Sequence, residues 1–205
     1  SFEFLDLISA RSETYEYPAA LPTVKLGTLD DDLRRRDFTI NAMAVRLDGD
    51  QAGELFDPFD GQTDLQNGLV RVLHLRSFID DPTRLFRAVR YAERYGFHIV
   101  PETQTLVPDA LQYVDKLSPE RLRHEFDLIF EEKNSATMLA SVANLGLLSA
   151  VQPALPLFNV KYLEWLGRVP STNFELELDR KTLGYLLWLM DAPESDHEGE
   201  RVREP

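Results

Sequence analysis

The sequence contains no cysteine, so it can form neither disulfide bonds nor thiolate metal sites. It also lacks a signal-peptide pattern and any run approaching about 18 apolar residues, so we predict no membrane span. The lack of cysteine is compatible with a cytoplasmic protein, which is the location we expect. The chain begins without Met at an apolar stretch, "SFEFLDLIS", and we expect this start to be a cut or an N-terminus missing from the sequence.

Positive charge is scarce, because 22 Lys and Arg face 35 Asp and Glu, for a net charge of −13. This balance argues against a protein that coats nucleic acid without selectivity. The charge is uneven, however, since residues 71–134 contain 11 acids and 10 Lys or Arg, whereas residues 1–70 contain 14 and 6. An arginine-rich segment within an acidic chain indicates a focused anion site rather than a broad basic surface.

The periodicity predicts an α+β protein, with a short mixed sheet and a helix followed by an all-helical part. Up to about residue 70 we predict a strand over 2–10, a loop over 16–27, a helix from Asp30 into "INAMAVRL", and a hairpin through "LDGDQAGELFD". Thereafter helical spacing dominates, punctuated by Pro82 and Gly96 around the first helix. The predicted helices cover residues 82–95, 101–115, 118–132, 135–145, 161–167 and 177–190.

Asp81 and Arg84 are three residues apart, which places both side chains on one face of a helix. A guanidinium donates hydrogen bonds and a carboxylate accepts them, so the pair fits a base edge with one acceptor beside one amine. Cytosine and adenine have such an edge, whereas uracil and guanine carry a carbonyl in place of the amine. A simpler interpretation also fits: Asp81 before Pro82 caps the helix, and the two side chains form an ordinary surface pair.

Arg87 and Arg90 continue the same helix in steps of three, and Arg94 follows one turn later. Stacked like charges are unfavourable by a few tenths of a kcal/mol per pair, so an anionic partner such as phosphate is expected. The alternative is that nearby acids, Asp80 and Glu93 among them, neutralise these arginines.

The stretch "DDDLRRRDFTINAMA", residues 30–44, sets three arginines between acids and an apolar run. The planar guanidinium suits phosphate oxygens, so Arg36 is a candidate nucleotide-binding residue. Asp37 could orient Arg36, accept a hydrogen bond from a ribose hydroxyl, or pair with Arg34. Asn41 is a further polar candidate one turn later. The charge pattern alone does not choose among these roles.

Four motifs together resemble the bacterial class II tRNA nucleotidyltransferases. They are "ARSETY…LP…DLRRRDFTINAMA", "FDPFDGQTDL", "DDPTRLFRAVRYAERYGF" and "SPERLRHE", in this order and at similar spacings over about residues 5–155. That family contains CCA-adding enzymes, CC-adding and A-adding specialists, and the related poly(A) polymerases. Each motif is weak alone, but four in order are specific. The segment "SETYEYPAALP" resembles A-adding members, so A-addition is one activity that the resemblance implies.

The resemblance implies a palm domain followed by a helical neck that selects the nucleotide. On this pattern Asp81 and Arg84 would read the base of CTP or ATP in place of a template. Arg87 and Arg90 would hold phosphate or ribose, and Arg36 would also reach the nucleotide. The resemblance implies palm residues 1–69, neck residues 70–133 and the start of a helical body over 134–205.

Two further features follow from the resemblance. Glu120 and Arg121 of "SPERLRHE" correspond to an element that braces the neck and does not contact substrate. At position 80 the family usually has Glu, whereas this chain has Asp80, a shorter acid that would support the templating arginine less well.

The catalytic metal site of the family is a Gly-Gly or Gly-Ser turn followed by an Asp-x-Asp pair, upstream of "ARSETY". This sequence has no such segment. The acids Asp48 and Asp50 flank Gly49, but they lie in a predicted hairpin turn without a preceding glycine pair, so we reject them as metal ligands. Asp6, five residues before Arg11, is the remaining carboxylate that we expect near Mg²⁺, and it is the candidate catalytic residue.

The implied activity is transfer of CMP or AMP from CTP or ATP to a tRNA 3′ end, and we expect this chain to be an incomplete form of such an enzyme. The expected partners are ATP or CTP and the tRNA 3′ end, with Mg²⁺ as cofactor. Two alternatives stay open: a poly(A) polymerase, and a catalytically silent module that binds a nucleotide or RNA.

Overall fold

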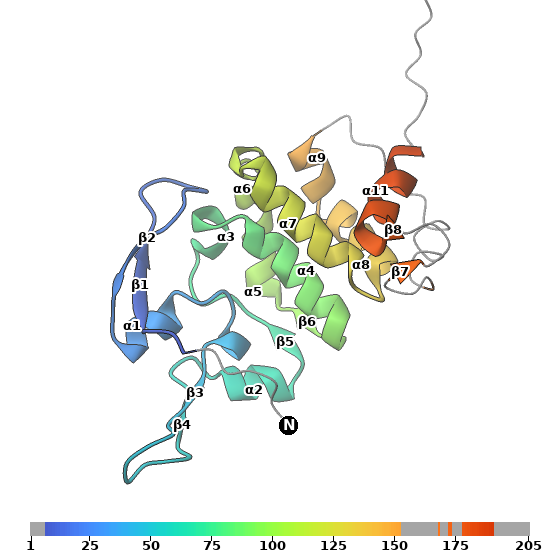
Figure 1. The fold of residues 1–205 in the computed structure, drawn as a ribbon. Helices are drawn as coiled ribbons and strands as arrows, with labels where there is room; N and C mark the ends of the chain where they lie inside the picture. Colours follow the sequence, from blue (N-terminus) through green and yellow to red (C-terminus); the bar gives the residue numbers. More distant parts are fainter. Residues whose placement is uncertain (1–6, 153–167, 169–171, 174–177, 191–205) are drawn as a thin grey trace, which may run out of the picture.

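In the computed structural model, which describes residues 7–152, 168, 172–173 and 178–190, regular structure begins with an antiparallel strand pair. Strand β1 (Arg11–Thr14) pairs with β2 (Thr23–Leu26) in the register Arg11 to Leu26 (Figure 1). The strand predicted over residues 2–10 is wrong for its described part, because residues 7–10 have no regular structure. The loop predicted over residues 16–27 contains β2, whose alternating "TVKL" follows the second proline.

The first helix, α1 (Leu29–Arg34), begins with a capping box between Thr28 and Asp31. We predicted that it would continue into "INAMAVRL", and this is wrong. The backbone becomes extended at Phe38, which forms an isolated bridge with Val72, and its side chain is fully buried. Burial of this ring outweighs the helical preference of the segment, leaving only a short 3₁₀ turn, η1 (Thr39–Asn41).

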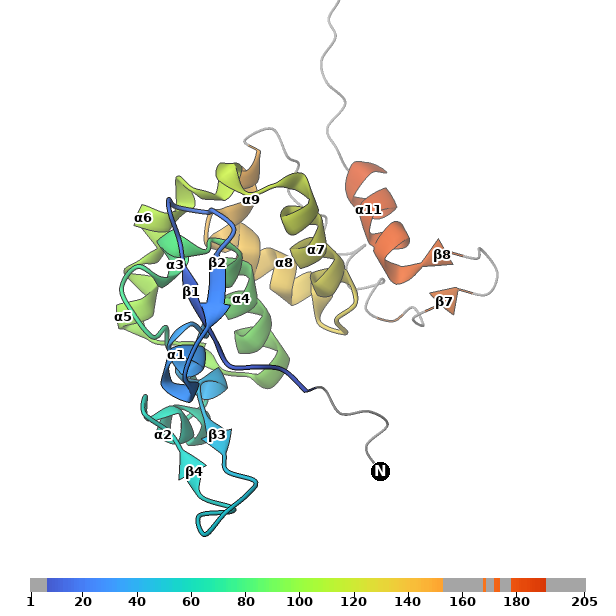
Figure 2. The ribbon, with the colours of Figure 1, turned by 60° about the vertical axis from the view of Figure 1, so that its left-hand side comes forward.

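The predicted hairpin is confirmed as β3 (Ala44–Val45) paired with β4 (Leu55–Phe56), and it projects away from the helices (Figure 2). Helix α2 (Gly61–Gln66) follows and was not predicted. The Asp57 carboxylate accepts hydrogen bonds from the amides of Gly61 and Gln62, both at 2.8 Å. Gly61 packs so closely on η1 that an added Cβ would overlap the backbone carbonyl of Thr39.

Beyond residue 70 the chain is mainly helical. Strand β5 (Leu69–Val70) pairs in parallel with β6 (His98–Ile99), and α4 (Thr83–Tyr95) connects them. Helix α4 ends before Gly96, as predicted, and this glycine has a left-handed φ of 66°. The helix predicted over 101–115 is divided into three pieces, and the first break precedes Pro108, which cannot donate a helical hydrogen bond and lies in the first turn of the second piece. The remaining helical elements are α3 (Ser77–Asp80), α5 (Pro101–Gln104), α6 (Val107–Leu111), η2 (Val114–Lys116), α7 (Pro119–Phe130), α8 (Ser135–Asn144) and α9 (Leu147–Val151).

The last described elements are a strand pair, β7 (Thr172–Asn173) with β8 (Leu178–Asp179), and helix α11 (Arg180–Met190). The helix predicted over 177–190 is therefore confirmed from Arg180 onward, whereas the one predicted over 161–167 lies outside the described residues. No helix in the described part of the chain has the length and apolar character needed to cross a membrane.

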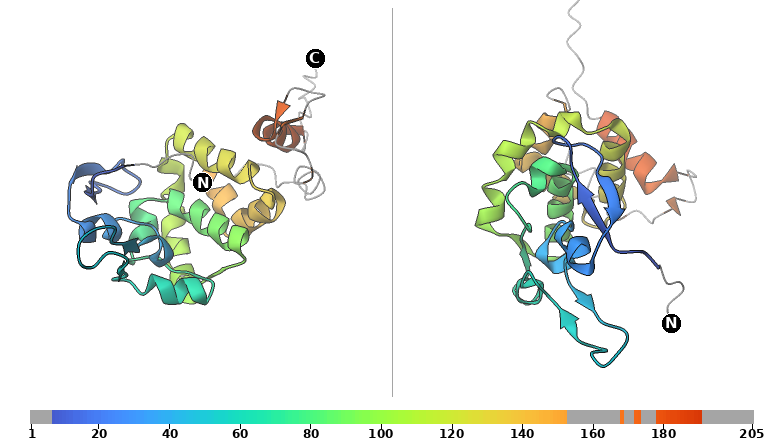
Figure 3. Two further views of the ribbon diagram at one scale, coloured as in Figure 1. Left: turned by 60° about the horizontal axis from the view of Figure 1, so that its bottom comes forward. Right: turned by 90° about the vertical axis from the view of Figure 1, so that its left-hand side faces the viewer.

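The hydrophobic core lies around α4, which packs against α7 and α8. Phe86 of α4 meets Phe126 of α7 edge to face, with ring centroids 5.6 Å apart. The opposite side of α4 faces the N-terminal elements, and Phe38 joins the two parts through a T-shaped contact with Tyr91. The two N-terminal strand pairs, β1–β2 and β3–β4, lie on one side of the large helices, whereas β7–β8 lies beside α11 at the other side (Figure 3). The predicted α+β class is confirmed.

Candidate functional site

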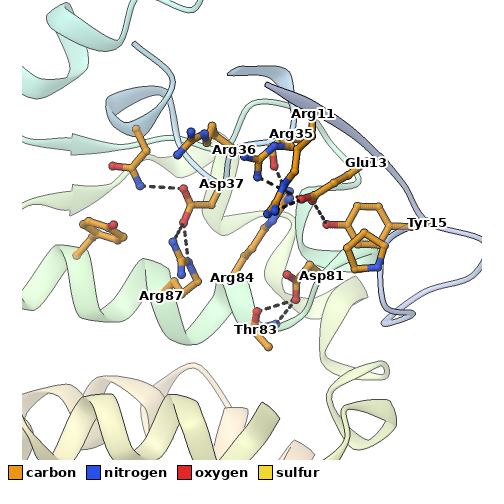
Figure 4. A pocket seen from close by; sticks show the side chains of 13 residues that line it. Arg11, Glu13, Tyr15, Arg35, Arg36, Asp37, Asp81, Thr83, Arg84 and Arg87 are labelled. Atoms are coloured by element: carbon orange, nitrogen blue, oxygen red, sulfur yellow. Dashed lines mark hydrogen bonds and ion pairs between the residues drawn. The ribbon is translucent and has the colours of Figure 1, made fainter. Parts of the chain in front are cut away.

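A cavity of about 560 Å³ lies between the N-terminal elements and the first turns of α4 (Figure 4). Its lining contains five arginines and three acids, so the cavity wall carries an excess of positive charge. Six of the residues predicted from the sequence line it: Arg36, Asp37, Asn41, Asp81, Arg84 and Arg87. Seven lining residues were not predicted: Arg11, Glu13, Tyr15, Pro22, Arg35, Thr83 and Tyr91.

Asp81 lies between α3 and α4 and uses one carboxylate oxygen for three hydrogen bonds. Its Oδ1 accepts from the amide of Thr83 at 3.0 Å and from the Thr83 hydroxyl at 2.6 Å. The same atom accepts from Nη2 of Arg121 at 2.6 Å. Within the described residues Oδ2 makes no hydrogen bond, so one oxygen anchors the start of α4 while the other is free to accept. The capping role that we considered is thus compatible with a second role.

Arg84 is buried at 4% exposure, yet no carboxylate of the described residues forms an ion pair with it. Its Nη1 donates to the Ser77 hydroxyl at 2.8 Å, and its Nη2 donates to the carbonyl of Arg35 at 2.9 Å. Two neutral acceptors therefore aim the guanidinium, while its charge stays uncompensated by these contacts. A buried charge without a counter-charge is costly, and such cost is common at binding sites.

Asp37 is buried and links three parts of the cavity wall. Its Oδ2 accepts a hydrogen bond from Nε of Arg87 at 2.6 Å and forms an ion pair with Nη2 of the same residue at 2.6 Å. Its Oδ1 accepts from Asn41 at 2.8 Å and from the amide of Phe38 at 3.0 Å. Burial alone would lower the pKa of Arg87, but the charge of Asp37 and the hydrogen bond with it raise that pKa instead. Asp37 therefore orients Arg87 rather than Arg36 or Arg34.

Asp32 holds the two arginines that follow α1. Arg35 donates to its Oδ1 at 2.7 Å and Arg36 donates to its Oδ2 at 2.7 Å. Burial would raise the pKa of Asp32, but the hydrogen bonds from Arg36 and Arg35 outweigh it and leave the pKa lowered. Nε of Arg36 is buried without a hydrogen-bond partner among the described residues, so this guanidinium has donor capacity left for a ligand.

Strand β1 contributes the side chains that sequence reasoning missed. Arg11, Glu13 and Tyr15 alternate along the chain, so they share one face. Glu13 accepts hydrogen bonds from Arg35 and from the Tyr15 hydroxyl, both at 3.2 Å, and it forms an ion pair with Arg11 at 3.2 Å. This two-residue alternation of polar side chains in "RSETY" was the available signal, and it was obscured by the prediction that the strand ends before Arg11.

Arg90 does not line the cavity. Its Nη1 donates to Oε2 of Glu125 on α7 at 3.0 Å, and the two side chains are only 9% and 5% exposed. Burial lowers the pKa of Arg90 and raises that of Glu125, because loss of hydration outweighs the attraction within the pair. The structure therefore separates Arg90 from Arg84 and Arg87, because three-residue steps rotate it away from the cavity and toward α7.

The described residues do not provide a metal site. No group of three or more acidic or histidine side chains among them could hold an ion, and the cavity acids Glu13, Asp37 and Asp81 are bound to arginines. Asp48 and Asp50 are exposed in the turn between β3 and β4, as predicted when they were rejected. Asp6, the predicted metal ligand, lies outside the described residues.

Two family models match the chain, one over the N-terminal residues that line most of this cavity and one over later helices that do not line it. Residues 2–71 match the poly A polymerase head domain, and residues 96–158 match the probable RNA and SrmB-binding site of polymerase A. The matched models describe two successive parts of proteins of the poly(A) polymerase type.

Comparisons with individual proteins show which members of this class the chain is similar to. The chain is 43% identical over 151 residues to the A-adding tRNA nucleotidyltransferase of Halalkalibacterium halodurans, covering 72% of this chain and 35% of that protein. It is 42% identical over 152 residues to the CC-adding tRNA nucleotidyltransferase of Deinococcus radiodurans, covering 74% and 40%. A solved CCA-adding enzyme in an apo form superposes with a TM-score of 0.78 at 34% identity, covering 91% of this chain and 46% of that one.

The chain belongs to the tRNA nucleotidyltransferase and poly(A) polymerase family. It spans less than half of the length of the two relatives. The family consists of nucleotidyltransferases, which are generally metal-dependent.

Proposed function

We propose that the chain is the nucleotide-selecting part of an enzyme that adds CMP or AMP from CTP or ATP to the 3′ end of tRNA. The observation that carries this proposal is that Arg84 and Asp81 line the same arginine-rich cavity. Arg84 is buried and forms no ion pair with a described acid, and Asp81 has one carboxylate oxygen without a hydrogen bond among the described residues. The relatives named as A-adding and CC-adding enzymes support the same substrates.

In this proposal the base is selected by its hydrogen-bonding edge. Asp81 Oδ2 accepts from the exocyclic amine of adenine or cytosine, and Arg84 donates to the adjacent ring nitrogen. Uracil and guanine present a carbonyl to Asp81, which leaves two acceptors facing each other without a proton between them. The resulting loss is of the size seen when buried polar groups stay unpaired, on the order of 1–3 kcal/mol.

The triphosphate and the ribose occupy the rest of the cavity. Arg36 and Arg87 come from different elements and reach the lining from two sides, which suits a ligand with several anionic groups. Asp37 and Asn41 fix Arg87 and are the candidate contacts for ribose hydroxyls. Arg90 is left out of this nucleotide site because Glu125 engages it on the far side of α4.

The reaction is attack of the RNA 3′ hydroxyl on the α-phosphorus, with pyrophosphate as the leaving group. We propose Mg²⁺ as the required metal, bound by carboxylates outside the described residues, with Asp6 the candidate within this chain. The palm, neck and body boundaries at residues 69 and 133, and a cytoplasmic location, stay predictions.

A titration with four nucleotides tests the proposal. We expect the chain to bind ATP and CTP at least about ten-fold more tightly than UTP and GTP, as measured by isothermal titration calorimetry. Asp81→Ala should remove this preference, and Arg84→Ala should weaken binding of all nucleotides and remove the preference as well. Equal binding of all four nucleotides by the unaltered chain would exclude base reading by these residues.

A poly(A) polymerase is the second candidate, because the matched head model carries that description. Tight binding of both ATP and CTP would fit a CCA-adding enzyme and exclude a poly(A) polymerase. Binding of ATP alone would fit a poly(A) polymerase or an A-adding enzyme, and these two differ in whether tRNA is the required acceptor. The third candidate, a silent module, predicts nucleotide binding without transfer when the chain is supplied with tRNA, nucleotide and Mg²⁺.

A further inference from the structure

One end of the cavity carries an aromatic ring beside the two proposed base-reading side chains. Tyr15 follows β1 directly, lines the cavity, and lies on the same side as Asp81 (Figure 4). Pro22, which precedes β2, also lines the cavity, so residues at both ends of the β1–β2 connection contribute to this wall. The cavity is otherwise lined mainly by charged groups, and this makes an apolar surface at the base-reading end distinctive.

The ring of Tyr15 is held at its polar end. The hydroxyl donates to Oε2 of Glu13 at 3.2 Å, and Oε1 of Glu13 is fixed by Arg11 and Arg35. Burial raises the pKa of Tyr15 to about 12, so the phenol is neutral at physiological pH. A neutral, anchored phenol presents its ring to a ligand with little loss of side-chain entropy on binding.

The segment that carries the ring is held as well. Ala19, midway along the β1–β2 connection, is buried and has a left-handed φ of 63°. Its amide donates to the carbonyl of Ile79 at 3.3 Å, and its carbonyl accepts from Nη1 of Arg121 at 3.0 Å. Because Nη2 of Arg121 also binds Asp81, one guanidinium fixes this connection and the reading carboxylate relative to each other.

Hydrogen bonds from Asp81 and Arg84 act in the plane of a base and leave both of its faces open. Aromatic side chains supply the missing contact in many nucleotide sites, because every base has a π face. We propose that Tyr15 is the stacking platform for the base of the incoming nucleotide, a role that rests on the proposed function. Stacking tolerates any base, so Tyr15 contributes affinity while Asp81 and Arg84 contribute selectivity. The larger adenine gains more from the ring than cytosine does.

Substitutions of Tyr15 in the full 205-residue chain test this role, with ATP and CTP as the probes. Tyr15→Leu keeps an apolar side chain but removes the π face, and it should weaken ATP binding by about 5- to 100-fold, with a smaller loss for CTP. Tyr15→Phe keeps the ring and loses only the hydrogen bond to Glu13, so binding should stay within about three-fold of the unaltered chain. In proton NMR spectra, the adenine H2 signal of bound ATP should move upfield with Tyr or Phe at this position and not with Leu.

A matched control is available two residues away. Tyr17 belongs to the same connection, is 64% exposed and does not line the cavity, so Tyr17→Leu should leave binding unchanged. Suppose that the unaltered chain prefers ATP and CTP over UTP and GTP, and that Tyr15→Leu binds ATP and CTP as tightly as the unaltered chain does. The stacking role is then wrong, and the proposed function survives. If the unaltered chain binds no nucleotide, the proposed function fails and the stacking role fails with it.

Discussion

Helix α4 places two arginines three residues apart in very different surroundings. Arg90 and Glu125 are sealed between α4 and α7, with side chains 9% and 5% exposed. Arg87 pairs with an equally buried acid, Asp37, but is itself 36% exposed and lines the cavity. Both are arginine–carboxylate pairs, and the difference lies in solvent access.

The comparison teaches that contact with the cavity, and not the presence of an acid partner, separates a candidate ligand-binding arginine from a structural one on this helix. Arg84 extends the series, because it is buried, has neutral partners and faces the cavity. Over these three positions of one helix the guanidinium changes from buried without an acid partner, to paired and accessible, to paired and sealed.

The largest expected effect comes from breaking the sealed pair. Glu125→Leu leaves Arg90 buried without its acid and should lower the free energy of unfolding by about 3–5 kcal/mol, measured by urea denaturation. The double variant Arg90→Met/Glu125→Leu should recover most of this loss, because two apolar side chains replace two buried charges. Equal stability of the single and double variants would contradict the comparison.

Breaking the accessible pair of Arg87 and Asp37 should lower the free energy of unfolding by less. In Arg87→Met, Asp37 keeps its hydrogen bonds from Asn41 and the amide of Phe38, and water can reach the vacated site. We expect a loss of about 1–2 kcal/mol in the free energy of unfolding. Affinity for ATP and CTP should fall by similar factors, because the proposed contact is to phosphate or ribose and not to the base. A change in the preference among bases would show that Arg87 has a different role.

A smaller effect is expected at Arg121, which touches Asp81 from α7. Arg121→Lys offers one ammonium nitrogen in place of the two guanidinium nitrogens that reach Asp81 and the carbonyl of Ala19, so it should hold these two groups less firmly relative to each other. The preference for ATP and CTP over UTP and GTP should fall by about three- to ten-fold, with unfolding changed by less than about 1 kcal/mol. Arg123→Lys, an exposed neighbour outside the cavity, is the control and should keep the full preference.

The smallest effect concerns pH and Asp32. Its folded-state pKa lies below its ordinary value, so the ionised form stabilises the fold above about pH 4, and this stabilisation is lost as pH falls through the folded pKa. Asp32→Asn should therefore be less stable than the unaltered chain at pH 6, on the order of 1 kcal/mol, with a gap that narrows toward pH 3. A gap that stays constant with pH would rule out ionisation as the cause.

Helix ends were predictable where a residue restricts the backbone. Pro82 and Gly96 bracket α4, and Ser118 with Pro119 begins α7, because their geometry and capping chemistry act locally. The same reasoning should have divided the segment 101–115 at Pro108. Strand β2 and helix α2 were missed because turn-forming residues surround them and their lengths are four and six residues.

Six of the eight site residues predicted from the sequence line one cavity, since the motifs that carry them are local. The acid partners of Arg87 and Arg90 were not predictable from spacing, because Asp37 lies 50 positions from Arg87 and Glu125 lies 35 positions from Arg90. The spacing of residues on a helix gives the angle between their side chains, but it does not show which part of the protein packs against each face of the helix. Whether the lining residues bind a nucleotide stays a prediction.

Gly61 illustrates how far the constraints of such a cavity extend. It contributes nothing to the lining, yet its Cα lies against the carbonyl of Thr39, between Asp37 and Asn41 in the chain. Any larger residue would displace the short turn that sets those two side chains. In a library of random variants selected for nucleotide binding, position 61 should therefore retain glycine as strictly as the positions of the cavity wall retain their residues. A map of tolerated substitutions alone would then suggest, wrongly, that residue 61 contacts the nucleotide.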